Sequence, residues 1–144
     1  MQLNLPHVRI VDLDSTISDD MWRLWLIDPT APDSESKYHA YHCYASEDKP
    51  INRYIVDESP APVVLLTARP EYLRQKTVEW LERHGFDYSL LLMRANDDHR
   101  PSAVMKKELV ENTVFKIARV ERAFDDREDV IEMYQSIGIK GVLV

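Results

Sequence analysis

The sequence predicts an α/β, doubly wound fold with a Rossmann-like, five-stranded parallel sheet and a small cap insertion after the first strand. Short runs rich in Val, Ile and Leu recur along the chain with little polar alternation, which is typical of parallel strands buried on both faces. Helical segments separate most of these runs, and this alternation favours right-handed crossovers. The 144 residues suit a single domain, residues 1–144.

Apolar runs, glycines and prolines predict where the helices and strands begin and end. Gly85 and Gly138 stand directly after two helical stretches, where a left-handed residue ends a helix, and Pro70 precedes the first stretch. The three predicted helices are Glu71–His84, residues 101–111 and Arg127–Ile137. The five predicted strands are Val8–Val11, Val63–Leu66, Ser89–Met93, Val120–Phe124 and Gly141–Val144.

Residues 18–61 interrupt this alternation. The segment from Ile17 to Pro62, both included, holds five of the eight prolines. A structureless loop of this length is uncommon in a compact domain. We therefore expect a small, partly helical cap over the end of the first strand, with Met21–Ile27 as one helix. Such a cap could act as a lid.

Aromatic residues are frequent in the insertion. Tyr38, Tyr41 and Tyr44 recur at a spacing of three, which places them on one helical face. We expect them to pack the cap onto the body of the domain; the alternative is a stacking surface for the bases of a nucleic-acid end. Trp22 and Trp25 are expected in the core of the cap. A zinc site is not expected, because only His39, His42 and Cys43 offer ligands and no second pair follows at finger spacing.

Composition excludes several classes of protein. Charged residues make up 30% and hydrophobic residues 44%, as in an ordinary soluble globular chain. The single cysteine excludes an internal disulfide and fits a reducing compartment. We see neither a membrane-spanning run nor a signal peptide, so a cytoplasmic protein without membrane association is expected.

Charge and glycine content argue against some classes of ligand. The net charge of −7 disfavours a broad electrostatic grip on nucleic acid, although a few arginines could still bind a short end. The chain has only three glycines, from which neither a dinucleotide fingerprint nor a P-loop can be built.

Polar residues follow four of the predicted elements at the edge where parallel strands end. Each one alone is most simply explained as a helix cap, a turn residue or a solvated side chain. Together they favour a ligand site, because ligands bind beyond the carboxyl ends of such strands. Clustered carboxylates repel one another, and hard oxygen ligands without a His–Cys set indicate Mg²⁺. The residues are Asp12, Asp14, Thr67, Arg69, Lys106, Asp125 and Asp126.

These residue types suit phosphoryl transfer. Mg²⁺ held by Asp12 and the Asp125/Asp126 pair would orient a phosphate, and a neighbouring carboxylate could attack phosphorus in line. A second carboxyl group two residues further on could protonate the leaving oxygen and then activate water. Thr67 and Lys106 could contact the equatorial oxygens of the transferred group.

The sequence resembles the haloacid dehalogenase (HAD) superfamily. DLDST from Asp12 to Thr16, LLTARP around Thr67, a lysine after the third strand and FDD before Arg127 are similar to its four motifs in order and spacing. The resemblance implies that Asp12 is the nucleophile and Asp14 the acid/base, with the backbone carbonyl of Asp14 also binding Mg²⁺. It makes Asp126 the preferred metal ligand of its pair, while Asp125 stays a candidate. Ser15 replaces the glycine common in the first motif.

The second half is similar to the 3′-phosphatase domain of phage polynucleotide kinase/phosphatase. The likeness lies in TVEWLERHGFDYSLLLMRANDDHRPSAVMKKELVE and AFDDREDVIEMYQSIGI. It implies that Arg69 contacts the substrate phosphate and that Arg23, nine residues beyond Asp14, is a second basic contact. Lys106 rather than Lys107 aligns with the family lysine. Thr16, at the same alternate spacing as the two carboxylates, is a further substrate-binding candidate. The missing P-loop means that no kinase half is expected.

The leading prediction is therefore a Mg²⁺-dependent phosphomonoester hydrolase acting through an aspartyl-phosphate on a polynucleotide 3′-phosphate end. One alternative has the same chemistry on free nucleotides or small phosphorylated metabolites. Another is a receiver-like phospho-switch, although a receiver carries its acidic pair after the first strand and its phospho-acceptor after the third. A catalytically dead homologue is disfavoured because all the motif residues are present. No obligate protein partner is evident.

Overall fold

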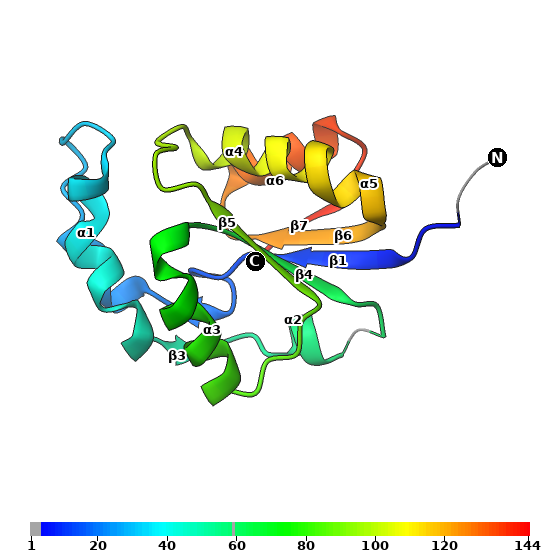
Figure 1. Cartoon of the computed structure of the whole chain (residues 1–144), viewed down its shortest axis with the longest axis horizontal. Helices are drawn as coiled ribbons and strands as arrows, with labels where there is room; N and C mark the ends of the chain where they lie inside the picture. The colour runs from blue at the N-terminus through cyan, green and yellow to red at the C-terminus, as the bar shows by residue number, and fades with distance from the viewer. Residues whose placement is uncertain (1–3, 59) are drawn as a thin grey trace.

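A five-stranded parallel sheet forms the centre of the molecule. The computed structural model describes residues 4–58 and 60–144. In the described residues the strands follow the order β5-β4-β1-β6-β7, and all four neighbouring pairs are parallel (Figure 1). This order confirms the predicted doubly wound fold. The strands are β1 (His7–Val11), β4 (Val63–Pro70), β5 (Leu90–Arg94), β6 (Arg119–Asp125) and β7 (Gly141–Leu143).

The middle strand β1 sets the register of the sheet. Val11 at its end lies opposite Leu65 of β4 and Phe124 of β6. Ile10 and Val11 are completely buried because helices cover both faces. This burial explains why the strands read as apolar runs rather than as alternating patterns.

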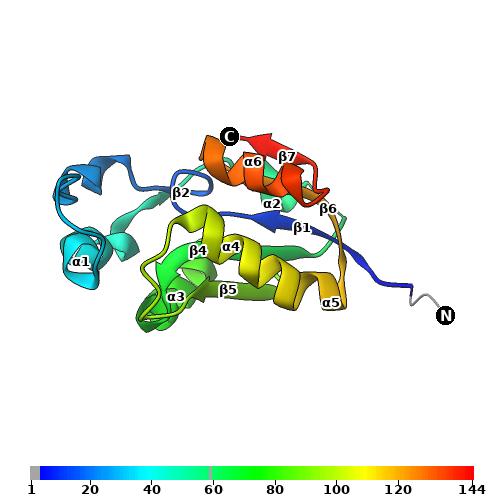
Figure 2. The ribbon, with the colours of Figure 1, turned by 90° about the horizontal axis from the view of Figure 1, so that it is seen from above.

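Two helical layers enclose the sheet, one on each face (Figure 1), and Figure 2 looks down onto the layer that contains α4 and α6. One core cluster contains Val11 and Leu65 of the sheet with Trp80 of α3 and Ile55 of α2. The other contains Ile10 with apolar residues of the opposite layer. The first layer comprises α2 (Tyr54–Asp57), η3 (Glu71–Leu73) and α3 (Arg74–Arg83). The second comprises α4 (Ser102–Leu109), the π-helical turn η4 (Val110–Val114), α5 (Phe115–Ile117) and α6 (Glu128–Ser136).

The helix ends follow the glycine signals. Gly85 after α3 has φ 68° and Gly138 after α6 has φ 83°, the left-handed conformation expected at both positions. The helix predicted over residues 101–111 is longer than expected, because helical turns continue from α4 through η4 to Ile117. No helix among residues 4–58 and 60–144 combines the length and apolar character that crossing a bilayer requires.

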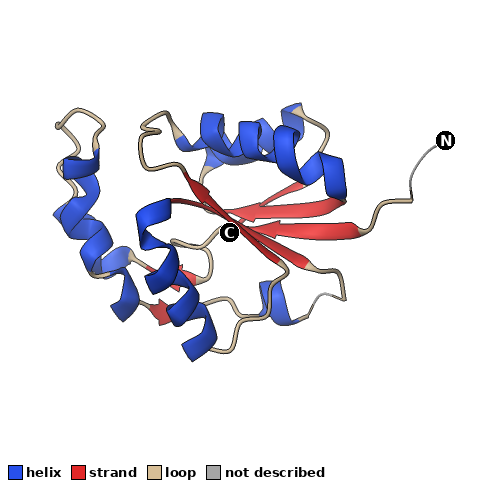
Figure 3. Ribbon diagram, viewed as in Figure 1, coloured by secondary structure: helices blue, strands red, loops and turns tan. Residues whose placement is uncertain are grey.

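Part of the insertion stands beyond the carboxyl ends of the strands (Figure 1). We call residues 18–50 the cap. Its base is a short antiparallel ribbon, drawn in red in Figure 3, in which Ser18 lies opposite Pro50. Residues 54–57, also expected within the insertion, form α2 and contribute to the core. The cap elements are β2 (Ser18–Asp19), η1 (Met21–Leu26), α1 (Glu35–Cys43), η2 (Ala45–Glu47) and β3 (Lys49–Pro50).

The expected packing of the cap is wrong in one respect. Trp22 and Trp25 do not form a core, since 45% and 78% of their surfaces are exposed. The helix predicted over Met21–Ile27 is a 3₁₀ helix, in which residues three apart share a face. Both tryptophans therefore face outward, and the one buried residue of η1 is Arg23.

The three cap tyrosines have different surroundings. Tyr41 is buried and packs beneath Arg23, whose guanidinium carbon lies 4.0 Å from the ring centroid. Tyr44 is 47% exposed at the end of α1 and meets the edge of Trp22. Tyr38 is half-buried on α1. The tyrosines thus do not form one common packing face.

Candidate active site

Three carboxylates meet where β1 and β6 end. These neighbouring strands lie at the switch point of the doubly wound sheet, the place where such folds bind ligands. The backbone N–H of Asp12 donates to the carbonyl of Phe124 at 3.0 Å, which ties the two strand ends together. One oxygen from each of Asp12, Asp125 and Asp126 lies within 4.8 Å of the others. Within the described part of the chain, this is the one group of three or more His, Cys, Asp or Glu side chains close enough to share a metal ion.

Lys106 from α4 joins two of these carboxylates. Its Nζ donates to Asp12 Oδ1 at 2.9 Å and to Asp125 Oδ2 at 2.6 Å. The lysine is 1% exposed, whereas its neighbour Lys107 is exposed. The choice of Lys106 over Lys107 therefore agrees with the geometry.

The electrostatics of the cluster suit a cation. Burial and then the charge of Asp125 raise the pKa of Asp12 well above its ordinary value. The same two causes raise the pKa of Asp126 to about 6. Burial opposes the charge of Lys106, but Asp12 and Asp125 outweigh it and raise the lysine pKa. One ammonium group thus faces three acids, and a hard divalent cation such as Mg²⁺ fits the remaining negative charge.

A tight turn after Asp12 places Thr16 behind the nucleophile candidate. Ser15 has φ 63°, the left-handed conformation that explains why glycine is common at this position. The N–H groups of Thr16 and Ile17 both donate to the carbonyl of Leu13, at 3.0 and 2.9 Å. Thr16 Oγ1 then donates to Asp12 Oδ2 at 3.1 Å and is completely buried. In this structure Thr16 orients Asp12 and lies away from the surface that substrate would reach.

Thr67 lies near the end of β4 and is 1% exposed. Its hydroxyl oxygen accepts a hydrogen bond from the backbone N–H of Arg69 at 3.1 Å. The hydroxyl proton remains a potential donor. This bond also bends the strand end, where the register with β5 shifts between Thr67 and Pro70.

Asp14 is held by both arginines that the phage-enzyme resemblance singles out. Arg69 donates to it from Nε at 3.1 Å and from Nη2 at 2.7 Å, and Arg23 donates from Nη2 at 2.8 Å. Burial raises the pKa of Asp14, but Arg69 and then Arg23 outweigh burial and lower it to about 2. Arg69 lines the cavity in front of the carboxylates, whereas Arg23 is completely buried within the cap and does not line it.

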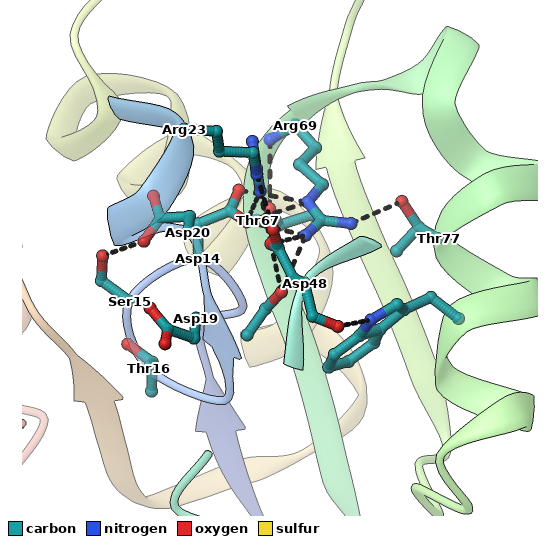
Figure 4. A network of polar contacts seen from close by, with 12 residues as sticks. Asp14, Ser15, Thr16, Asp19, Asp20, Arg23, Asp48, Thr67, Arg69 and Thr77 are labelled. Carbon is teal, nitrogen blue, oxygen red and sulfur yellow. Dashed lines mark hydrogen bonds and ion pairs between the residues drawn. The ribbon is translucent and has the colours of Figure 1, made fainter. Parts of the chain in front are cut away.

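Asp48 is the residue that sequence analysis missed. Its carboxylate accepts hydrogen bonds from Arg23 Nε at 2.8 Å and Nη2 at 2.6 Å (Figure 4). Ser18 and Trp22 also donate to it, at 2.6 and 3.0 Å, and its carbonyl accepts from Trp80 at 2.8 Å. Asp48 is 2% exposed. It binds Arg23, which in turn binds Asp14. In sequence it is one acid in a polar stretch, with no motif to mark it.

A cavity of about 600 Å³ opens in front of these groups. Asp12, Asp14, Lys106 and Asp126 line its inner part. Side chains of the cap and of the loops after β4 and β5 line the rest, among them Tyr38, His42, Tyr72, Arg94 and Asn96. Asp12, Asp14, Asp126 and Lys106 therefore border one cavity with room for more than a phosphate group, whereas Asp125 is completely buried and does not line it.

Residues 6–144 match the family model described as the polynucleotide kinase PNKP phosphatase domain, of the HAD type. The match covers nearly the whole chain. The chain belongs to this family. It is a HAD-type phosphatase domain, which confirms the resemblance seen in the motifs.

Individual relatives agree with this assignment. The chain is 26% identical over 140 residues to a protein of Autographa californica nuclear polyhedrosis virus named as a bifunctional polynucleotide kinase/RNA ligase. It also resembles, with a TM-score of 0.76 and 27% identity, a chain in the structure of the Pnkp1/Rnl/Hen1 RNA repair complex. These alignments cover 95% and 99% of this chain, but 19% of the viral protein and 43% of the chain in the complex. The chain thus spans less than half of either relative.

A more distant structure shows the fold alone. A haloacid dehalogenase-like hydrolase from Streptococcus pneumoniae superposes with a TM-score of 0.64 at 15% identity, covering 96% of this chain and 84% of that one. The receiver-like alternative is wrong, because the chain belongs to a phosphatase family. The positions of the acids along the chain also differ from those of a receiver. The site carboxylates stand at the ends of β1 and β6, whereas β5, the third strand of the parallel sheet in chain order, ends at Arg94.

Proposed function

We propose that this chain removes the phosphate from the 3′ end of a polynucleotide through an aspartyl-phosphate at Asp12. The observation that carries this proposal is the setting of Asp12. Lys106 and Thr16 each bond one of its oxygens, and Asp14 and Arg69 lie with it on the wall of one cavity. Family membership, the polynucleotide kinase/RNA ligase name of the viral relative and the RNA repair complex that contains the other relative support the substrate class.

In the first step an oxygen of Asp12 attacks phosphorus, and the bond from phosphorus to the 3′ oxygen breaks. The leaving oxygen takes a proton from Asp14, which yields a free 3′ hydroxyl and the aspartyl-phosphate. Asp14 can hold this proton once Arg69 turns from its carboxylate to the substrate phosphate, because Arg69 does most to lower the pKa of Asp14. In the second step water attacks phosphorus and gives its proton to Asp14. This releases inorganic phosphate and restores the Asp12 carboxylate.

The other polar groups bind the substrate phosphate or orient the reacting groups. In this proposal Lys106 and the Thr67 hydroxyl stabilise charge on the phosphoryl oxygens, and Arg69 binds the incoming phosphate. Mg²⁺ would be held by Asp12, Asp126 and the main-chain oxygen of Asp14, with Asp125 beside it, and would supply positive charge to the phosphate. Arg23 acts here through Asp14 rather than through substrate.

A free 3′-nucleotide is the second candidate substrate. Asp33, Glu35 and Asp98 line the cavity and offset the positive charge of Arg94 and Arg100 there, so the cavity offers no uniformly positive track for a long run of phosphates. A substrate with a single phosphate would not need such a track.

One experiment compares these substrates directly. Phosphate release with Mg²⁺ is measured on a 3′-phosphorylated oligonucleotide, its 5′-phosphorylated twin and a free 3′-nucleotide, with Asp12→Asn as the control. We expect the highest kcat/KM on the oligonucleotide 3′ end and no turnover by the variant. A preference for the mononucleotide would favour the second candidate. Undiminished activity of Asp12→Asn would remove Asp12 as the nucleophile.

A further inference from the structure

Three aromatic residues also line the cavity. Tyr38 and His42 come from α1 in the cap, whereas Tyr72 comes from η3 in the body. The His42 ring centroid lies 6.0 Å from that of Tyr38 and 6.3 Å from that of Tyr72, with interplanar angles of 36° and 83°. All three line the cavity that also contains Asp12. We call these three residues the aromatic wall.

The aromatic wall is suited to a flat, uncharged group. His42 is 9% exposed, and burial lowers its pKa to about 4, so its ring is neutral at pH 7. Its buried Nδ1 has no hydrogen-bond partner among the described residues. Tyr38 and Tyr72 are partly exposed, so their rings offer surface on which an aromatic ligand could stack, and His42 adjoins both.

The wall packs against neighbouring residues and is accessible from the cavity. Tyr41, which also borders the cavity, lies against His42 with its ring centroid 5.2 Å away. The backbone N–H of Tyr72 donates to Asn96 Oδ1 at 2.8 Å, which fixes η3 against the loop after β5. The Tyr72 side chain is nevertheless 40% exposed, so a ligand ring could cover it.

We propose that Tyr38, His42 and Tyr72 form a subsite that stacks the terminal nucleobase of the substrate while its 3′-phosphate lies at Asp12. This inference rests on the proposed function and deepens it by naming how the end of the strand is bound. Because stacking uses the face of the base, the subsite accepts all four bases. It distinguishes a nucleotide end from a phosphorylated sugar without a base.

The test compares two 3′-phosphorylated oligonucleotides that differ only in the presence of the terminal base. The wild-type protein is expected to lose about tenfold or more in kcat/KM on the abasic end. Tyr38→Ala and Tyr72→Ala are expected to lose this preference, whereas Tyr38→Phe and Tyr72→Phe keep it. Tyr44→Ala is the matched control, since Tyr44 lies just beyond α1, contacts Trp22 and does not line the cavity.

The preference for a base is a ratio within each protein, so partial unfolding of a variant does not affect it. Equal kcat/KM of the wild type on both oligonucleotides would overturn the subsite while leaving the 3′-phosphatase activity intact. An unchanged ratio in both alanine variants would also overturn it. Release from neither oligonucleotide would instead refute the proposed function, and the subsite with it.

Discussion

Lys106 Nζ lies 2.9 Å from Asp12 Oδ1 and 2.6 Å from Asp125 Oδ2, so one buried ammonium group links the ends of two strands. Asp12 follows β1 and Asp125 ends β6, while the lysine comes from α4. The same group therefore orients the nucleophile candidate and offsets the repulsion between two buried carboxylates. Removing it should affect both activity and stability.

Lys106→Met is expected to lower phosphate release by about 100-fold or more, because an apolar side chain cannot stabilise the phosphoryl oxygens. The free energy of unfolding should fall by about 3–5 kcal/mol, since the variant leaves buried carboxylates without their partner. Lys107→Met is the matched control, because Lys107 is exposed on the same helix. Equal activity of the two variants would contradict the assigned role.

Mg²⁺ should raise the melting temperature of the chain. At a concentration about tenfold above its Kd, a ligand stabilises the folded state by ~1.4 kcal/mol, or about 4 °C for a chain of this size. Asp126→Asn should abolish most of this shift, and EDTA should reverse it in the wild type. Asp129→Asn, an exposed acid on α6 that pairs with Arg127, should keep the shift. A full shift in Asp126→Asn would place the metal elsewhere.

Arg69→Lys should separate substrate binding from metal binding. Lysine keeps the charge but cannot reproduce the two bonds to Asp14 or the bond from Nη1 to Thr77 at 3.2 Å. We expect kcat/KM to fall by about 10- to 100-fold and the Mg²⁺-induced melting shift to stay unchanged. A lost melting shift with normal turnover would show that Arg69 serves the metal site instead.

Asp48→Asn should destabilise the cap and the acid/base together. The amide offers donors where Arg23 also offers donors, so the buried guanidinium loses one of its two carboxylate partners and keeps only Asp14. The cost of breaking such a buried pair is about 3–5 kcal/mol, which urea unfolding can measure. Asp57→Asn removes the acid of an exposed pair with Arg53 and should change little. Similar unfolding curves for the two variants would show that Asp48 is dispensable.

His42 should make the free energy of unfolding depend on pH between about 4 and 6.5. Burial lowers its pKa from 6.5 to about 4, so the unfolded chain binds a proton that the folded chain excludes. Its contribution is complete above pH 6.5 and is lost as the pH falls toward 4. The loss at pH 5 is about 2 kcal/mol. Unfolding of His42→Phe at pH 7.5 and 5 should show a smaller decrease than the wild type. His39→Phe, on the same helix, should behave as the wild type, and equal slopes for all three would refute the role of His42.

Much of the body could be predicted from local patterns. Burial on both faces makes parallel strands read as apolar runs, so β1 and β4 were recognisable without any contact information. Gly85 and Gly138 marked helix ends because left-handed backbone disfavours other residues. The carboxylates of the site were recognisable because all strands of a parallel sheet end at one edge. Residues at the ends of different strands therefore lie close together in space.

The cap could not be predicted in this way. No local pattern indicated that Trp22 and Trp25 would face outward while Arg23 was buried. The burial of Arg23 depends on carboxylates that are distant in the sequence. Asp48 carries no motif, and it meets Arg23 because the β2–β3 ribbon brings the two ends of the cap together. Tyr72 likewise joins the cap residues Tyr38 and His42 only in the folded chain.

The sequence by itself therefore determined the doubly wound sheet and the identity of the residues that converge on Asp12. Both follow from short-range rules, since hydrophobic runs specify buried strands and strand direction specifies a common edge. Only the tertiary structure decided that Thr16 lies behind Asp12, that Arg23 binds Asp14 and Asp48, and that an aromatic wall faces the cavity. The physical reason is that these contacts join segments far apart in the chain, and their geometry is set by how the cap packs on the body.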